Sequence, residues 1–249
     1  MTSQRVPVFE YFEATDNCSV LLTCEHAGRR IPPELNGLGL SKDEINRHIG
    51  WDIGAEAVCR ELRAATGAAL FIGRFSRLVV DLNRPANSPE CVIGVSDGTE
   101  IPGNLGLSER EREDRIREFH RPFHEKLAEV VDETRPSAIL PIHTFTPVLN
   151  SDGVKRPWHC AVLYLEAAAL GKRCIRFLKS YDDILVGENI PYRIEPKRDF
   201  TVPVHGDRRG IPSVLMEIRQ DLVESADGQR RWAKKLAEMM RACLPSDPG

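Results

Sequence analysis

Three side chains suited to metal binding or proton transfer lie in or directly after apolar runs. His26 follows the run 20–25, His143 ends the run 138–142, and Glu217 lies inside the run 214–218. Histidine nitrogens and carboxylate oxygens are preferred zinc ligands. An ionised carboxylate within an apolar strand is costly unless it is paired or near a metal. Together these three residues could bind and use one divalent cation.

A catalytic zinc site needs three protein ligands, an open position for water and a nearby general base. His26 and His143 supply two ligands, and Asp52 is the predicted third. Asp52 could instead cap the N-terminus of the helix that follows it. Glu25 is the alternative ligand, although side chains at adjacent strand positions usually point to opposite faces.

Glu217 is the predicted general base of this site. The alternative is a buried salt bridge between Glu217 and Arg219 or another arginine.

The segment 76–85 carries a second group of polar residues. Period-2 alternation over a predicted strand places Arg77, Asp81 and Asn83 on one face, and Arg84 follows at the strand end. The Arg84 guanidinium can hold a carboxylate through two hydrogen bonds, and Asn83 adds an amide donor. The alternative is an arginine–aspartate ladder that closes the sheet edge.

The remaining histidines carry weaker signals. His120 and His124 are four residues apart on a predicted helix, but no glutamate completes an H-E-x-x-H pattern. They are therefore predicted to pack at the edge of the helix's apolar stripe. His205 lies in a predicted polar loop and is expected to line the site or to be exposed.

Strands alternate with helices along the chain, which predicts an α/β sheet covered on both faces. Four main helices are predicted: one that ends at residue 66, one that starts at residue 108 and extends beyond residue 130, and two over 167–179 and 228–243. Capping boxes are predicted at Ser41–Glu44 and Ser108–Glu111. No linker divides the chain, so one domain is predicted over residues 1–249. Ligands of such sheets bind beyond the carboxyl ends of the strands. The predicted strands are 19–24, 68–72, 77–82, 137–143, 160–165 and 213–218.

Composition excludes several classes of function. The 249 residues include 34 basic and 37 acidic side chains, and the net charge of −3 argues against nucleic acid or an anionic membrane as the main partner. The sequence contains no apolar run of membrane-spanning length, no signal peptide, no phosphate-binding glycine loop and no G-x-S-x-G motif. Seven cysteines without a C-x-x-C pair favour a reducing, cytoplasmic location.

Several motifs together resemble the N-formylglutamate amidohydrolase family. The most specific are Asp81-Leu-Asn-Arg84 and Glu217-Ile-Arg-Gln-Asp-Leu222, and the others are Thr23-Cys-Glu-His-Ala-Gly28, Trp51-Asp-Ile-Gly54 and Asn189-Ile-Pro-Tyr192. That family is similar to zinc carboxypeptidases and to the aspartoacylase and succinylglutamate desuccinylase group. The resemblance implies a single-domain, three-layer α/β sandwich with a mixed, mostly parallel sheet.

The resemblance also implies an activity and residue roles. The implied reaction is hydrolysis of an N-acyl amide on an acidic amino acid, with His26 and His143 as metal ligands and Glu217 as the residue that activates water. Asn83 and Arg84 match the pair that binds the substrate. Zinc carboxypeptidases use an H-x-x-E motif, but Arg29 stands three residues after His26. The resemblance therefore leaves the third ligand open between Asp52, which is predicted, and Glu25.

The combined prediction is a zinc-dependent amidohydrolase acting on a small N-acyl amino acid such as N-formylglutamate. Arg77 or Arg84 would stabilise the oxyanion, and the sequence leaves open which of them does so. His205 is predicted to help bind the substrate. The alternatives are a deacylase or peptidase of another N-acyl amino acid and a non-catalytic binding protein for an acidic small molecule. The sequence does not indicate an oligomeric state.

Overall fold

A seven-stranded mixed sheet forms the centre of the fold in the computed structural model, which describes residues 6–244. Its strand order is β1-β3-β2-β6-β9-β7-β8. The four central strands β3, β2, β6 and β9 run parallel to one another. On one side β1 runs antiparallel to β3, and on the other β7 runs antiparallel to β9 and parallel to β8. The strands are β1 (Phe9–Phe12), β2 (Val20–Cys24), β3 (Ala69–Gly73), β6 (Ala138–Phe145), β7 (Cys160–Leu163), β8 (Val186–Glu188) and β9 (Leu215–Arg219). A separate hairpin pairs β4 (Val95–Ser96) with β5 (Thr99–Glu100).

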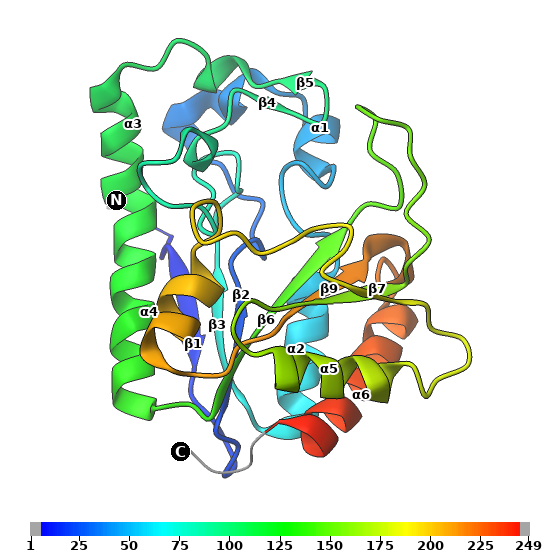
Figure 1. Cartoon of the computed structure of the whole chain (residues 1–249). Coiled ribbons are helices and arrows are strands. Elements are labelled where there is room, and N and C mark those ends of the chain that lie inside the picture. Colours follow the sequence, from blue (N-terminus) through cyan, green and yellow to red (C-terminus); the bar gives the residue numbers. More distant parts are fainter. Residues whose placement is uncertain (1–5, 245–249) are drawn as a thin grey trace.

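Helices cover both faces of this sheet. In Figure 1, α3 and α4 lie along one side of the sheet, and α2, α5 and α6 lie along the other. Alternation along the buried strands supplies both cores: Leu22 packs in the α2–α5–α6 layer and Leu21 in the α3–α4 layer. The prediction of a three-layer α/β sandwich is therefore confirmed. The helices are α1 (Lys42–Asn46), α2 (Ala55–Thr66), α3 (Glu109–Arg115), α4 (Arg121–Thr134), α5 (Ala168–Leu178) and α6 (Ala226–Cys243).

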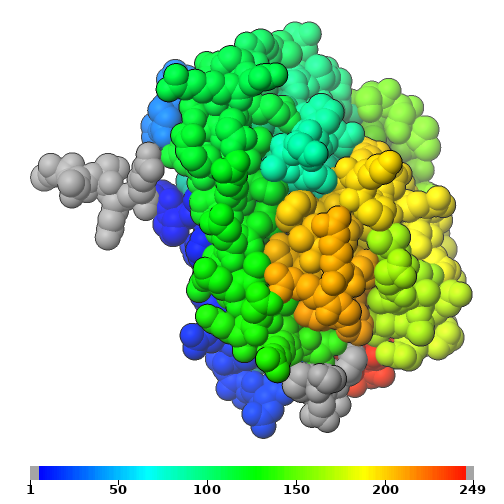
Figure 2. Space-filling view, turned by 60° about the vertical axis from the view of Figure 1, so that its left-hand side comes forward, coloured from blue at the N-terminus to red at the C-terminus, as the bar shows by residue number. Residues whose placement is uncertain are grey.

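The helix boundaries follow the signals in the sequence. Both predicted capping boxes form, at the starts of α1 and α3, and Gly67 ends α2 in the left-handed conformation. A π-helical turn over Ile116–His120 joins α3 to α4. Figure 2 shows this long helical unit along one side of the molecule, with the orange segment after residue 200 beside it. Within residues 6–244, no helix is long and apolar enough to span a membrane.

The predicted strand over residues 77–82 is wrong, because this segment forms consecutive turns. The Ser76 hydroxyl accepts a hydrogen bond from Leu78 N, and the Asp81 carboxylate accepts one from Asn83 N. Such local side-chain bonds compete with strand pairing. The apolar residues of the segment are buried under α3 and α4 rather than in the sheet. Arg77 and Asp81 consequently approach each other across a turn, not along one face of a strand.

Candidate active site

Three neighbouring parallel strands bring the predicted residues to one edge of the sheet. His26 follows the end of β2, His143 lies in β6, and Glu217 lies in β9 directly beside His143 in the strand register. Asp52 comes from the segment before α2, where its backbone N–H donates to the His26 carbonyl at 2.9 Å. Since β2, β6 and β9 run in the same direction, their carboxyl ends meet where ligands of α/β sheets bind.

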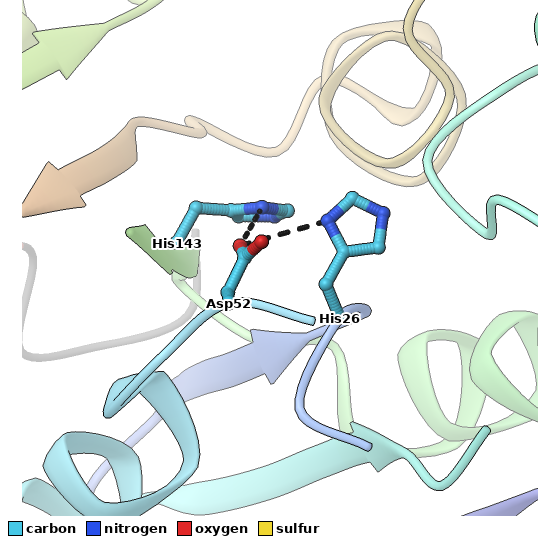
Figure 3. Close-up of side chains that lie close together, drawn as sticks. All are labelled: His26, Asp52 and His143. Carbon is cyan, nitrogen blue, oxygen red and sulfur yellow. Dashed lines mark ion pairs between the residues drawn. The ribbon is translucent and has the colours of Figure 1, made fainter. Parts of the chain in front are cut away.

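The Asp52 carboxylate lies between two imidazole rings (Figure 3). Its Oδ2 is 2.9 Å from His143 Nδ1 and 3.6 Å from His26 Nδ1. One ligand atom from each of the three residues lies within 4.8 Å of the others. Asp52 does not cap α2, whose N-cap is Gly54 with no side-chain hydrogen bond. The structure thus brings together the three residues predicted to bind the metal.

A second carboxylate holds the far nitrogen of each ring. Asp81 Oδ1 is 2.8 Å from His26 Nε2, and Glu25 Oε2 is 2.7 Å from His143 Nε2. These carboxylates accept from the Nε2–H groups, so with a cation bound each Nδ1 atom would offer its lone pair to the metal. Carboxylate–histidine–metal arrangements of this kind orient ligands in zinc sites.

One atom of the cluster has no partner. His26 Nδ1 is buried and makes no hydrogen bond within residues 6–244. A buried polar atom without a partner costs free energy, and a cation among the three ligand atoms would remove that cost. Two imidazole nitrogens and one carboxylate oxygen are the donor set of many catalytic zinc sites, so these residues fit a divalent cation.

The electrostatics of the cluster also favour positive charge at its centre. Burial alone would raise the pKa values of Asp52 and Glu25, but interactions with His143 and His26 outweigh it and lower both. Burial would lower the pKa of His143, but hydrogen bonds with Asp52 and Glu25 raise it well above the usual value. The ionised Asp52 carboxylate therefore lies at the space that a cation would occupy, and the ionised Glu25 carboxylate lies behind the His143 ring.

Glu217 is buried and forms no ion pair with an arginine of residues 6–244. Its Oε2 makes no hydrogen bond within residues 6–244, and Arg219 pairs with Asp221 instead. Burial is the largest cause that raises the pKa of Glu217, to about 7. The expected alternative of a buried salt bridge is therefore not found, and the carboxylate faces the cavity described below.

A cavity of about 540 Å³ opens in front of this cluster, a size typical of small-molecule sites. Asn83 and Arg84 line it together with His26, Asp52, His143 and Glu217. Arg84 donates through Nη1 to Asp199 at 2.8 Å and through Nε to Glu90 at 3.2 Å.

Donors on Asn83 and Arg84 are left for a ligand. Arg84 Nη2 has no hydrogen-bond partner among the described residues. Asn83 Oδ1 accepts from two backbone N–H groups, of Phe200 and Thr201, and its amide N–H group makes no hydrogen bond in the same part of the chain. Both side chains therefore offer unused donors beside the cavity.

Arg77 also lines the cavity, but its nitrogens are occupied by carboxylates. Its Nη2 and Nε donate to Asp81 Oδ2 at 2.7 and 3.1 Å, and its Nη1 donates to Asp52 Oδ1 at 3.3 Å. Arg77 thus contacts both the proposed ligand Asp52 and the carboxylate that holds His26. This placement supports a role in orienting the cluster, and its predicted role at an oxyanion stays a prediction.

His205 is buried and lies outside the set of residues that line this cavity. Its Nε2 is 3.0 Å from His124 Nδ1, and the two rings stack. His124 Nε2 in turn donates to the Leu82 carbonyl at 2.7 Å, and His120 Nε2 donates to the Arg84 carbonyl at 2.8 Å. The expected packing of His120 and His124 extends to His205, which the structure does not bring to the cavity wall.

Comparison with known proteins decides the family. The model of the N-formylglutamate amidohydrolase family matches residues 18–224, which include the whole cluster. The chain belongs to the N-formylglutamate amidohydrolase family. No curated protein matches it by sequence. The family assignment supports an amidohydrolase, and the extension of the domain to residues 1–249 stays a prediction.

Solved structures share the fold of this family member. A gene product of Agrobacterium tumefaciens is 34% identical with a TM-score of 0.88, and the alignment covers 94% of this chain and 93% of that one. An N-formylglutamate amidohydrolase from Ralstonia eutropha is 17% identical with a TM-score of 0.63, covering 94% and 96%. A bacteriophage poly-gamma-glutamate hydrolase is 11% identical with a TM-score of 0.50, covering 96% and 91%. The last two likenesses show the fold alone.

The sequence did not predict the role of the two carboxylates that hold the histidine rings of this site. The sequence places Asp81 only on one face of a predicted strand, with an arginine–aspartate ladder as the alternative, whereas the structure shows its carboxylate holding His26 and Arg77. Glu25 was weighed as a ligand, whereas its carboxylate holds the far nitrogen of His143. The position of Asp81 in the Asp-Leu-Asn-Arg motif was the available signal. The segment 189–199 forms much of the cavity wall and was noted only for its Asn189-Ile-Pro-Tyr192 motif.

Proposed function

We propose that the chain is a metal-dependent amidohydrolase that removes a small acyl group, such as formyl, from the nitrogen of an acidic amino acid. The observation that carries this proposal is the convergence of His26, Asp52 and His143 on one cavity. That cavity also contains Glu217, whose Oε2 has no hydrogen-bond partner within residues 6–244. The family assignment supports the N-formylglutamate class of substrate.

His26, Asp52 and His143 would hold the cation, with zinc favoured by their donor set. When bound, a divalent cation acts as a Lewis acid toward the acyl carbonyl and lowers the pKa of the attacking water. Asp81 and Glu25 keep the two imidazole rings oriented, and Arg77 holds Asp52 and Asp81 in turn.

Glu217 serves as the general base and then as the general acid. It takes a proton from water as the oxygen attacks the acyl carbon, and it passes that proton to the nitrogen as the carbon–nitrogen bond breaks. In the metal-free protein burial raises the pKa of Glu217 to about 7, and a nearby cation would lower it and favour the carboxylate that accepts the proton. The products are the carboxylic acid of the acyl group and the free amino acid.

Asn83 and Arg84 bind a carboxylate of the substrate. The Arg84 Nη2 and the Asn83 amide N–H group are donors without partners among the described residues. Glu90 and Asp199 hold the other nitrogens of Arg84, which fixes the direction of its guanidinium. An acidic amino acid offers the matching carboxylate.

A cytoplasmic location is part of the same proposal. All seven cysteines are free thiols, and six of them are buried. Free buried thiols are typical of proteins kept in a reducing compartment.

Metal analysis combined with a substrate panel tests the proposal. We expect about one divalent metal ion per chain, and hydrolysis of N-formyl-glutamate and N-formyl-aspartate in preference to N-formyl-leucine, followed as amine release. Treatment with a chelator should abolish turnover, and added zinc should restore it. Full turnover in metal-free protein would refute metal dependence. Tight binding of acidic acyl amino acids without hydrolysis would show a binding protein instead.

A further inference from the structure

Arg156 is a buried cation without an anionic partner. Arg156 is only 8% exposed, and no carboxylate within residues 6–244 forms an ion pair with it. Burying a charge without an opposite charge is costly. Two arginines that line the cavity, Arg77 and Arg84, each contact two carboxylates. Arg156 therefore differs from both, which calls for a functional explanation.

The strongest contact of Arg156 is with Tyr192. Arg156 Nη1 donates to the Tyr192 hydroxyl oxygen at 2.7 Å, and the guanidinium carbon lies 5.1 Å from the centre of the phenol ring. Because the hydroxyl oxygen accepts from Arg156, the hydroxyl proton is left to donate elsewhere. No residue of the described chain accepts that proton.

Tyr192 and Glu217 line the same cavity. Tyr192 is 38% exposed where it lines the cavity, and a phenol keeps its proton at neutral pH. Within residues 6–244 the Tyr192 O–H has no protein acceptor, and the buried Glu217 Oε2 has no protein donor. An amide undergoing hydrolysis supplies what both lack, an oxygen that gains negative charge and a water that gives up a proton.

We propose that Tyr192 donates a hydrogen bond to the acyl oxygen as it becomes an oxyanion, and that Arg156 is a positioning residue that orients and polarises Tyr192. This inference rests on the proposed function. Water oxygen bonds to the acyl carbon while the carbonyl π electrons move to the acyl oxygen, which accepts from Tyr192 without taking its proton. Glu217 carries the water proton to the leaving nitrogen, the carbonyl reforms and the carbon–nitrogen bond breaks.

Tyr192→Phe is the central test, because it removes one oxygen atom and keeps the ring against Phe145. Loss of a single oxyanion donor should lower kcat by roughly a hundredfold and leave KM nearly unchanged. Metal content should also stay the same. Tyr181→Phe is the matched control, since its hydroxyl bonds Glu238 and lies outside the cavity wall. An unchanged kcat in Tyr192→Phe, or a rise in KM alone, would overturn the inference.

Arg156 is tested through its dependence on Tyr192. Arg156→Met should lower kcat by about tenfold in the wild-type background and by less than twofold in the Tyr192→Phe background. Arg156→Lys, which keeps a positive charge, should recover part of the loss. Equal losses from Arg156→Met in both backgrounds would show a merely structural role. If Arg156→Met fails to fold, Arg156→Lys is measured in the wild-type and Tyr192→Phe backgrounds instead. A loss confined to the wild-type background supports the positioning role, and equal losses overturn it.

A binding measurement decides the question without turnover. The probe is a phosphonate analogue of N-formylglutamate, in which a tetrahedral anionic group replaces the formyl group, and calorimetry measures its affinity. Tyr192→Phe should bind this analogue about tenfold more weakly and bind L-glutamate as the wild type does. Equal affinity of both proteins for the analogue would overturn the role of Tyr192. A wild type that binds the analogue but hydrolyses no acyl amino acid would refute the proposed function alone.

Discussion

Two groups of buried histidines contact residues 81–84, and their surroundings differ. The first is the cluster of His26 and His143 with Asp52, in which carboxylates hold the Nε2 atoms and the Nδ1 atoms point toward a shared centre. The second is the cluster of His120, His124 and His205. Its rings bond to backbone carbonyls and to one another.

The partners of the rings determine what each cluster can do. Carboxylates raise the pKa of His143 despite its burial and leave room for a cation. In the second cluster burial dominates and lowers the pKa values of His120, His124 and His205, so these rings are neutral at pH 7. Neutral rings that bond to carbonyls stabilise a turn, whereas rings backed by carboxylates attract positive charge. A buried histidine is therefore a weak indication of a metal site by itself. A carboxylate bonded to the ring nitrogen that faces away from the proposed metal is a stronger indication.

Removing a ring from the first cluster should have the largest effect. His26→Ala and His143→Ala should each abolish stoichiometric metal binding and lower hydrolysis at least about a hundredfold, because one of three protein ligands is lost. The fold should remain, since a chain of this length does not depend on metal to fold. Elemental analysis and circular dichroism measure both. His159→Ala is the control, from outside both clusters. Unchanged metal content in both variants would show that the first cluster does not bind the metal.

Asp52→Asn should weaken metal binding strongly, because the ligand between the two rings loses its charge. Glu25→Gln should weaken it by only about 10–100-fold, the usual effect of changing a residue that orients a ligand. Competition with a chromophoric chelator gives both affinities. The reverse ranking would identify Glu25 as the third ligand and Asp52 as the residue that orients His143.

Glu217→Gln separates the base from the ligands. Turnover should fall by roughly a hundredfold or more, because Gln cannot accept the proton. Metal content should stay the same, and Arg84 and Asn83 should still bind the substrate. Near-normal turnover with metal lost would instead show that Glu217 is a ligand of the cation.

The raised pKa of Glu217 also predicts a pH effect on stability in metal-free protein. The folded-state pKa of about 7 lies above the ordinary value of 4.5, so the folded protein binds more protons between these values. Wild-type stability should therefore fall, relative to Glu217→Gln, as pH rises from about 4.5 to 7. The difference should reach about 3 kcal/mol at most. Denaturant unfolding at pH 5 and pH 8 measures it, and an equal difference at both pH values would contradict the burial argument.

The smallest effect on metal binding is expected in the second cluster. His124→Gln breaks the bonds to His205 and to the Leu82 carbonyl, which should lower the free energy of unfolding by about 1–3 kcal/mol. Metal content should not change. Loss of metal in this variant would show that the second cluster supports Asp81 through residues 81–84, and the two clusters would then form one functional unit.

Much of the fold was determined by the sequence alone. The apolar runs that became β2, β3, β6, β7 and β9 were recognised because strands buried on both faces are continuously apolar. Capping boxes and Gly67 placed the helix ends because they satisfy backbone groups locally. The edge strands β1 and β8 were missed, since short, partly exposed strands carry a weaker apolar signal.

The site was determined by the sequence only in part. The identities of His26, His143, Glu217 and Asp52 followed from their positions at the ends of apolar runs or beside a helix start. The tertiary structure decided which partners these side chains have, because Asp81, Glu25 and Arg77 reach them from separate segments. The same physics explains the error over residues 77–82: Ser76 and Asp81 bond to nearby backbone and form turns. Alternating residue types cannot reveal such turns, because their stability comes from contacts that exist only once the chain has folded.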